Sequence, residues 1–378
     1  MPLALRPEFA GQEPYGAPQL DVPVVLNTNE NPYPPADEVV AEIASRVADA
    51  AAGLNRYPDR EALELRGELA GYLARESGVR LPASQIWAAN GSNEVMAQIL
   101  QAYAGPGRTV LTFTPSYSMY PEYARNVYST FVGIERREDF SIDCAALADQ
   151  FAQHRPAVVL IASPNNPTGT AVEPGDLQRI LEASRGVGPQ LTNGAEGAGG
   201  ADRADAIVVV DEAYGEFRRE GVPSALELLD EYPNLIVTRT MSKAFGAAGL
   251  RLGYMAASQE IIDSVRIVRL PYHLSAVSQA AALAALAHRD SLMEQVEQIR
   301  QERDKLASTL TGMGLDVAPS DANFIMFGTF ADRHKVWQRL LDQGILIREV
   351  GPEGWLRVSI GQPHENEAFV AGLKEAMR

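Results

Sequence analysis

The residue with the clearest chemical potential is a lysine in a run of small residues. Lys243 lies in the segment TMSKAFGAAGLRLGY, eight positions before Arg251. The other three lysines lie among charged and polar residues; they are Lys305, Lys335 and Lys374. Small neighbours let other groups approach closely, and partial loss of water lowers the pKa of an amine toward its neutral, nucleophilic form. Lys243 is therefore a candidate nucleophile, although a lysine that reaches solvent from a buried turn fits the same pattern.

Other candidate groups directly follow short apolar segments that are typical of buried strands. The turn SPNNPTG, which contains Asn166, follows residues 157–162, and Asp211 and Tyr214 follow residues 206–210. Because ligands of open α/β sheets bind beyond the carboxyl ends of the strands, we expect these side chains to meet in one site. Each group taken alone also has a structural explanation, as a helix cap or as part of a tight turn.

A single ligand would account for these groups together. It would need an aldehyde for Lys243 and a basic ring nitrogen for Asp211. It would also need a phenolic oxygen near Asn166 and Tyr214, and a phosphate near Arg251. Pyridoxal 5′-phosphate has all four groups, and its ring acts as an electron sink while an aspartate keeps the ring nitrogen protonated.

The predicted phosphate site has a second component in the segment NGSNE, residues 90–94, which opens a predicted helix. Amide groups at a helix N-terminus have no partner within the helix and favour a negative charge, so they suit phosphate. The guanidinium group of Arg251 would add a bidentate, charge-assisted contact. In the segment PSYSMY, Tyr117 provides an aromatic ring that can stack on the cofactor ring.

The order of predicted elements indicates an α/β fold with a mostly parallel central sheet flanked by helices. Short β-branched apolar runs, typical of strands buried on both faces, alternate with helical patterns. These runs are residues 109–113, 157–162, 206–210 and 235–238. A long helical pattern then extends over residues 275–311, followed by a smaller set of strands and helices. The expected parts are an N-terminal arm that joins the small domain, a large cofactor-binding domain and a small α+β domain, at residues 1–35, 36–274 and 275–378.

Residues 185–205 depart from this regular pattern. Their sequence, RGVGPQLTNGAEGAGGADRAD, is rich in Gly and Ala and poor in large apolar residues. Such a composition predicts a flexible surface loop. Its length indicates an insertion between two core strands that does not touch the site.

The composition of the 378-residue chain argues against several classes of partner. Its net charge of −16 disfavours nucleic acids and anionic membranes, and no apolar run is long enough to span a bilayer. The N-terminus has no basic segment followed by a long apolar one, so no secretory signal is expected. The single cysteine, Cys144, excludes an intrachain disulfide and fits the reducing cytoplasm. The five histidines lack metal-ligand spacing, so no metal site is expected.

Longer segments resemble a known family. SPNNPTG, DEAYGEF and TMSKAFGAAGLRLGY, in this order and spacing, resemble the fold-type-I pyridoxal-phosphate-dependent aminotransferases over nearly the whole chain. LNTNENPYPP, NRYPD, GSNE, PSYSMY, RLPYHLS and LRVSIG are similar to segments of the histidinol-phosphate aminotransferases within that group. The loop at residues 185–205 is not part of the family pattern. The resemblance implies the fold-type-I architecture, pyridoxal 5′-phosphate as cofactor, small-molecule substrates and an obligate homodimer.

The resemblance also implies roles for particular residues. Lys243 would form the covalent link to the cofactor and act in catalysis with Asp211, at the ring nitrogen, and Tyr214, at the phenolic oxygen beside Asn166. The remaining cofactor contacts would be those of Ser92, Asn93, Ser242 and Arg251 with the phosphate, of Tyr117 with the ring face, and of Tyr57 with the phosphate in the neighbouring subunit. Arg357 would bind the substrate carboxylate. Further candidates for the substrate pocket are Tyr15, Asn29, Asn323 and Arg348.

The implied reaction is the ping-pong transfer of an amino group from L-histidinol phosphate to 2-oxoglutarate, within histidine biosynthesis. Its products would be imidazole acetol phosphate and L-glutamate. Arg357 and Arg348 would accept a phosphate and a carboxylate in turn, since a guanidinium suits both anions. For Arg348, an ion pair with Glu349 is the structural alternative. An aromatic amino-acid aminotransferase, a decarboxylase of the same fold and a protein that only binds a ligand stay open as alternative functions.

Overall fold

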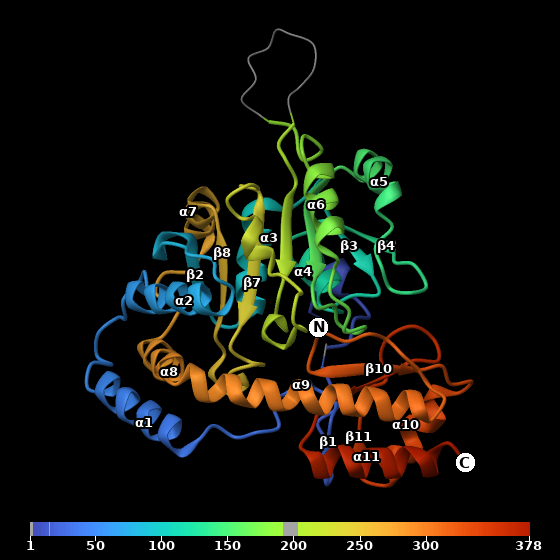
Figure 1. Cartoon of the computed structure of the whole chain (residues 1–378). Coiled ribbons are helices and arrows are strands. Elements are labelled where there is room, and N and C mark those ends of the chain that lie inside the picture. Colours follow the sequence, from blue (N-terminus) through green and yellow to red (C-terminus); the bar gives the residue numbers. More distant parts are fainter. Residues whose placement is uncertain (1–2, 15, 192–202) are drawn as a thin grey trace.

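The computed structural model describes residues 3–14, 16–191 and 203–378 of the chain (Figure 1). Tyr15, a candidate for the substrate pocket, lies outside these ranges, as does most of the Gly/Ala-rich loop. Within the described ranges, every helix is too short or too polar to cross a lipid bilayer.

The centre of the molecule is a mostly parallel sheet, which confirms the predicted α/β class. Its strands, in spatial order, are β2 (Ile86–Ala89), β8 (Gly253–Ala257), β7 (Leu235–Thr240), β6 (Ile207–Asp211), β5 (Pro156–Ala162), β3 (Thr109–Thr114) and β4 (Thr130–Glu135). From β7 to β4 all neighbours are parallel, whereas β8 runs antiparallel to both β7 and β2. The carboxyl ends of β5, β6 and β7 therefore lie at one edge of the sheet, where the candidate residues follow them.

Both faces of the sheet are buried because apolar residues occupy successive positions in the central strands. In β6, Val208 and Val210 pack into one core, and Ile207 and Val209 pack into the other. The helices of the first core include α2 (Leu63–Glu76), α5 (Leu147–His154), α6 (Pro174–Ala183) and α8 (Ala276–Ala287). Those of the second are α3 (Ser92–Tyr103), α4 (Tyr120–Asn126) and α7 (Gln259–Val268). The result is a sheet between two layers of helices.

The C-terminal part of the chain forms smaller sheets. In one of them β10 (Phe324–Gly328) pairs antiparallel with β12 (Leu356–Ser359) and β9 (Asp316–Val317). In the other, β1 (Val24–Val25) of the N-terminal arm pairs with β11 (Ile345–Leu346), so the arm joins the C-terminal part. The remaining helices are α1 (Asp37–Ala51), α9 (Arg289–Gly312), α10 (Arg333–Asp342) and α11 (Pro363–Ala376). In Figure 1, α9 runs from beside α8 to the small sheet. The domain boundary at residue 275 stays a prediction.

The long helix predicted over residues 275–311 is in fact two helices. α8 ends at Ala287 and α9 begins at Arg289, and His288 between them has non-helical backbone angles. The residues of α8 are mostly small and apolar and pack against α1 and α2, whereas α9 is polar with a buried stripe. The break at His288 therefore lies where the pattern of buried residues changes.

The described residues on either side of the segment 192–202 pair with each other. Gln190 and Arg203 form an antiparallel bridge. The Gly188 N–H donates to Ala204 O at 2.9 Å, and the Ala204 N–H donates to Pro189 O at 3.0 Å. The ends of the segment are thus held together between α6 and β6.

Deletion of residues 193–200 should therefore change the free energy of unfolding by about 1 kcal/mol or less and leave kcat unchanged. The paired ends already close the loop, and the entropy of loop closure depends only weakly on length. Thermal melting and steady-state activity measure the effect. A Gly/Ser replacement of equal length is the control, and a large loss of activity in the deletion alone would show that the segment contacts the site or a partner.

Candidate active site

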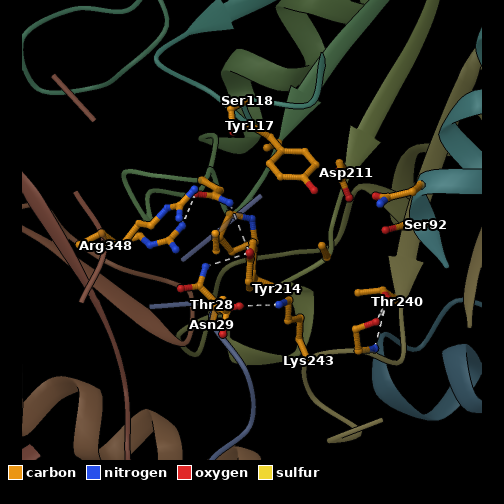
Figure 2. A pocket seen from close by; sticks show the side chains of 18 of the residues that line it. Thr28, Asn29, Ser92, Tyr117, Ser118, Asp211, Tyr214, Thr240, Lys243 and Arg348 are labelled. Atoms are coloured by element: carbon orange, nitrogen blue, oxygen red, sulfur yellow. Dashed lines mark hydrogen bonds between the residues drawn. The ribbon is translucent and has the colours of Figure 1, made fainter. Parts of the chain in front are cut away.

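The carboxyl ends of the central strands open into a cavity of about 280 Å³. Its wall combines the N-terminal arm, the start of α3, the turns after β3, β5, β6 and β7, and the C-terminal part of the chain (Figure 2). The predicted residues that line it are Asn29, Ser92, Asn93, Tyr117, Asn166, Asp211, Tyr214, Ser242, Lys243, Arg251, Arg348 and Arg357. The structure thus brings together groups that lie more than 300 residues apart in the sequence.

Lys243 lies in the turn after β7, and its amine points into this cavity (Figure 2). Nζ donates a hydrogen bond to the carbonyl oxygen of Thr28 at 3.0 Å. Burial, together with the positive charge of Arg357, lowers the pKa of Lys243 from 10.5 to about 8. A sizeable fraction of the amine is therefore neutral near physiological pH, as a nucleophile requires. Lys305, Lys335 and Lys374 are exposed on helices, as their sequence context predicts.

Asp211 is the last residue of β6 and is largely buried at the base of the cavity. Its Oδ1 accepts a hydrogen bond from Thr238 Oγ1 at 3.0 Å, and its Oδ2 accepts one from the Tyr120 hydroxyl at 3.2 Å. Burial raises the pKa of this carboxyl, and the two hydrogen bonds oppose that shift because they favour the charged form.

The Tyr214 hydroxyl is the meeting point of three segments. It accepts hydrogen bonds from Asn29 Nδ2 at 3.0 Å and from Asn166 Nδ2 at 3.5 Å. Asn323 is fully buried and donates from Nδ2 to the Asn29 carbonyl at 3.0 Å. Unlike Asn29, Arg348 and Arg357, Asn323 is not among the described residues that line the cavity, and it instead orients the N-terminal arm.

The start of α3 and Arg251 form a narrow cradle at one end of the cavity. Gly91 precedes the helix with φ of +81° and offers no side-chain cap to the first amide groups. A Cβ atom at Gly91 would lie 2.8 Å from Arg251 Nη2, so only glycine lets the guanidinium approach the helix so closely. Ser242 Oγ accepts hydrogen bonds from Arg251 Nη1 at 3.5 Å and from Thr240 Oγ1 at 3.0 Å. Such a set of N–H and O–H donors suits a phosphate group.

Two guanidinium groups lie on the opposite wall. Arg348 and Arg357 face each other in an antiparallel bridge, so their side chains are on the same side of the backbone. Arg357 donates from Nη1 to Asn166 Oδ1 at 2.6 Å and from Nη2 to Asn27 O at 2.9 Å. Arg348 Nη2 contacts Gly16 O at 3.4 Å. An ion pair between Arg348 and Glu349, the structural alternative considered above, is not observed. Glu349 instead pairs with Arg333 and His334.

Some residues that line the cavity were not predicted from the sequence. Asn27, Thr28, Ser118 and Thr240 also line the cavity. Thr28 contributes a main-chain carbonyl, for which the sequence gives no signal. Thr240 ends the observed strand β7, two positions beyond the predicted strand and two before Ser242, so its position in the sequence could have indicated it. Tyr57 is 78% exposed and stacks on Tyr272, with ring centroids 4.3 Å apart, outside the cavity of its own chain.

The lowered pKa of Lys243 leads to a test with cofactor-free protein. We expect pyridoxal 5′-phosphate to attach at a rate that rises with pH through a midpoint of about 8, because only the neutral amine attacks an aldehyde. Stopped-flow absorbance gives the rate, and borohydride reduction with peptide mapping identifies the labelled lysine. Labelling of Lys305, Lys335 or Lys374, or a midpoint near the ordinary value of 10.5, would contradict the assignment.

Known proteins are similar to the chain over almost its whole length. The model of the class I and II aminotransferase family matches residues 22–188 and 200–373, and its gap falls inside the loop predicted to be an insertion. A histidinol-phosphate aminotransferase 3 of Burkholderia lata is 54% identical over 99% of this chain and 96% of its own. The histidinol-phosphate aminotransferase of Bifidobacterium adolescentis is 53% identical over 100% and 96%.

Solved structures agree with the fold. The histidinol-phosphate aminotransferase of Sinorhizobium meliloti in complex with pyridoxal 5′-phosphate is 25% identical, with a TM-score of 0.82 over 99% of this chain and 97% of that one. L-threonine-O-3-phosphate decarboxylase of Porphyromonas gingivalis has the same fold, with a TM-score of 0.70 at 20% identity over 94% and 99%.

The cavity fits pyridoxal 5′-phosphate. It combines a partly neutral lysine, a buried carboxylate, a tyrosine hydroxyl that receives two amide donors, and a cradle of donors that a single Cβ atom would fill. These groups match the aldehyde, ring nitrogen, phenolic oxygen and phosphate of that cofactor. With the match of the family model over most of the chain, they lead to one conclusion: the chain belongs to the class I and II aminotransferases and is a pyridoxal-phosphate-dependent enzyme.

Proposed function

We propose that this protein transfers the amino group of L-histidinol phosphate to 2-oxoglutarate and so forms imidazole acetol phosphate and L-glutamate. The reaction belongs to histidine biosynthesis. The names of relatives that are more than 50% identical over the full length support this substrate. The chain's single cysteine favours a reducing compartment, so we place the reaction in the cytoplasm.

Bound pyridoxal 5′-phosphate would supply an aldehyde for the amino group and a ring that accepts the electron pair left at Cα. Lys243 would hold the cofactor covalently until the amino donor replaces it. Its free Nζ would then take the proton from the substrate Cα, for which a pKa of about 8 is well matched. The hydrogen bond to Thr28 O would keep the amine oriented in the cavity.

The other cofactor residues would bind and orient. Asp211 would hold a proton on the ring nitrogen, and Tyr214 with Asn166 would contact the phenolic oxygen. Tyr117 would cover a face of the ring: in Figure 2 its ring lies beside Asp211 at the cavity. The phosphate would be held by Ser92, Asn93, Ser242 and Arg251, at the uncapped start of α3.

The observation that carries the substrate proposal is the pair of arginines opposite this cradle. Arg357 is nearly buried and already fixed by Asn166 and Asn27, so it is preorganised to bind a planar anion in bidentate fashion. Arg348 lies beside it and adds a second positive charge. A wall with two guanidinium groups suits a phosphate of higher charge as well as the carboxylate groups of 2-oxoglutarate.

The alternative functions differ in products. An aromatic amino-acid aminotransferase would share the cofactor residues and prefer phenylalanine or tyrosine as donor. A decarboxylase would release carbon dioxide without a keto acid, and a decarboxylase does occur among proteins of this fold. Purified protein supplied with histidinol phosphate or phenylalanine, each with and without 2-oxoglutarate, distinguishes these functions by glutamate and carbon dioxide formation.

The two arginines should have separable effects on substrate choice. Arg348→Ala should lower kcat/KM for histidinol phosphate about ten- to a hundred-fold, as expected for a lost charge-assisted hydrogen bond of about 1.5–3 kcal/mol, and should affect glutamate less. Arg357→Ala should raise KM for both substrates, because each presents an anion to it. Arg179→Ala, on the exposed surface of α6, is the control. A wild type that prefers phenylalanine to histidinol phosphate would replace this proposal by the aromatic aminotransferase function.

We also propose that the active form is a homodimer. Large apolar side chains are exposed on the described surface between the end of α1 and the start of α2, and at the end of α7 and just after it; they are Leu54, Tyr57, Leu63, Ile267 and Leu270. The two segments lie together, because Glu61 pairs with Arg269 at 2.7 Å and Tyr57 stacks on Tyr272. Exposed apolar groups of this size favour a protein interface. Tyr57 would then reach the cofactor phosphate bound by the partner.

A hybrid dimer tests this arrangement. A Tyr57→Phe subunit and a Lys243→Ala subunit should each form weak or inactive homodimers. In the hybrid, the subunit with intact Lys243 receives an intact Tyr57 from its partner, so about half of the wild-type activity per dimer should return. Co-expression with two affinity tags isolates the hybrid. An unrestored hybrid, or a monomer in analytical ultracentrifugation of the wild type, would contradict the proposal.

A further inference from the structure

Tyr120 is a buried residue that contacts two parts of the site without lining the cavity. It is the first residue of α4 and is fully shielded from solvent. Its ring makes a T-shaped contact with that of Tyr117, with centroids 5.6 Å apart, and its hydroxyl donates to Asp211 Oδ2 at 3.2 Å. The described residues that line the cavity do not include Tyr120, so any effect it has on the chemistry must act through a neighbour.

Thr238 contacts the same carboxylate from the other side. It lies in β7, directly opposite Asp211 in the pairing of β6 with β7, and is fully buried. Its Oγ1 donates to Asp211 Oδ1 at 3.0 Å. Each carboxylate oxygen therefore has its own hydroxyl donor, one from a strand and one from a helix, and the plane of the carboxylate is fixed.

The charge balance around Asp211 depends on these donors. Burial and the neighbouring carboxylate of Glu212 both raise the pKa of Asp211, whereas the hydroxyls of Thr238 and Tyr120 and the Ala213 N–H lower it. Burial beside Asp211 also raises the pKa of Tyr120 far above its usual value, so the phenol remains a donor. Arg136 places a positive charge near Tyr120, and its Nε donates to Phe113 O at 3.3 Å.

We propose that Tyr120 and Thr238 are positioning residues that clamp Asp211 as an oriented, ionised carboxylate against the ring nitrogen of the cofactor. Hydrogen-bond donors stabilise the charged carboxylate relative to its neutral form, so they favour the state in which the proton stays on the ring nitrogen. This inference rests on the proposed role of Asp211, and it is independent of the identity of the amino donor.

Two variants remove the donors with little change of shape. Tyr120→Phe keeps the ring and its contact with Tyr117, and Thr238→Val keeps the branched side chain in β7. Tyr232→Phe is the matched control, because its hydroxyl donates to the Glu182 carboxylate at 2.9 Å, at α6 and away from the cavity. Asp211→Asn marks the effect of losing the ionised carboxylate altogether.

The readouts are kcat, KM and the visible absorption of the holoenzyme as a function of pH. A positive ring nitrogen lowers the pKa of the nitrogen that joins Lys243 to the cofactor, so a weaker clamp should shift the midpoint of the absorption change to higher pH. For Tyr120→Phe and Thr238→Val we expect this upward shift and a loss of about ten-fold or more in kcat, with KM nearly unchanged. Tyr232→Phe should match the wild type, and Tyr120→Phe should have no further effect on the midpoint in the Asp211→Asn background.

Each other outcome overturns the inference. An unchanged midpoint in Tyr120→Phe and Thr238→Val, with a shifted one in Asp211→Asn, would show that Asp211 acts without the clamp. If Tyr120→Phe lost kcat without a shift of the absorption midpoint, or if Tyr232→Phe lost as much, Tyr120 would have only a structural role. An unshifted midpoint in Asp211→Asn would remove the proposed role of Asp211 and the clamp with it. If Tyr120→Phe fails to fold, the midpoint of Thr238→Val decides alone.

Discussion

The buried guanidinium of Arg239 holds together the strand ends on which the active site is built. It donates from Nε to Glu212 at 2.8 Å and from Nη1 to Glu216 at 3.0 Å, and it pairs with Glu76 of α2 at 3.2 Å. A Cβ atom at Gly215 would lie 2.8 Å from this guanidinium, so the chain just after Tyr214 packs directly on it. Removing one partner of such a buried ion pair typically destabilises a protein by about 3–5 kcal/mol.

This network explains how the candidate catalytic groups keep a fixed geometry on turns. Arg239 and Glu212 directly follow Thr238 and Asp211, and successive side chains of a strand point to opposite faces. The ion pair and the hydrogen bond from Thr238 to Asp211 therefore join the ends of β6 and β7 on both faces of the sheet. Lys243 lies four residues after Arg239, so the ion pairs of Arg239 also hold the start of the turn that carries Lys243.

The strands of the fold differed in how predictable they were. The segments now seen as β3, β5, β6 and β7 were found within two residues of their observed ends, because their apolar β-branched runs are buried on both faces. β4 was missed because it lies at the edge of the sheet and most of its residues are partly exposed. β8, with the sequence GYMAA, was missed because glycine and alanine are not typical of strands. Its five residues are nevertheless buried, because the neighbouring strands and helices cover them.

The site was predictable where the ligand itself demands particular residue types. The candidate lysine, aspartate, tyrosine and arginine residues that line the cavity were selected because each matches a group of the cofactor or of an anionic substrate. Tyr120 and Thr238 were not found, since they contact Asp211 and no ligand group calls for them. Such residues depend on the three-dimensional packing of a helix and a strand, and a single sequence contains no local signal for them.

The charged groups that line the cavity are mainly positive, although the chain as a whole is negatively charged. These positive groups affect both the binding of anions and the pKa of Lys243. The chain carries a net charge of −16, yet Lys243, Arg251, Arg348 and Arg357 line the cavity, and Asp211 is the acidic residue among its described lining residues. The charge of Arg357 helps to lower the pKa of Lys243. A substrate anion bound to Arg357 would offset that charge and raise the basicity of the amine just when a proton has to be removed from Cα. If Arg357 binds the substrate as proposed, it would therefore also adjust the basicity of Lys243, the proposed base.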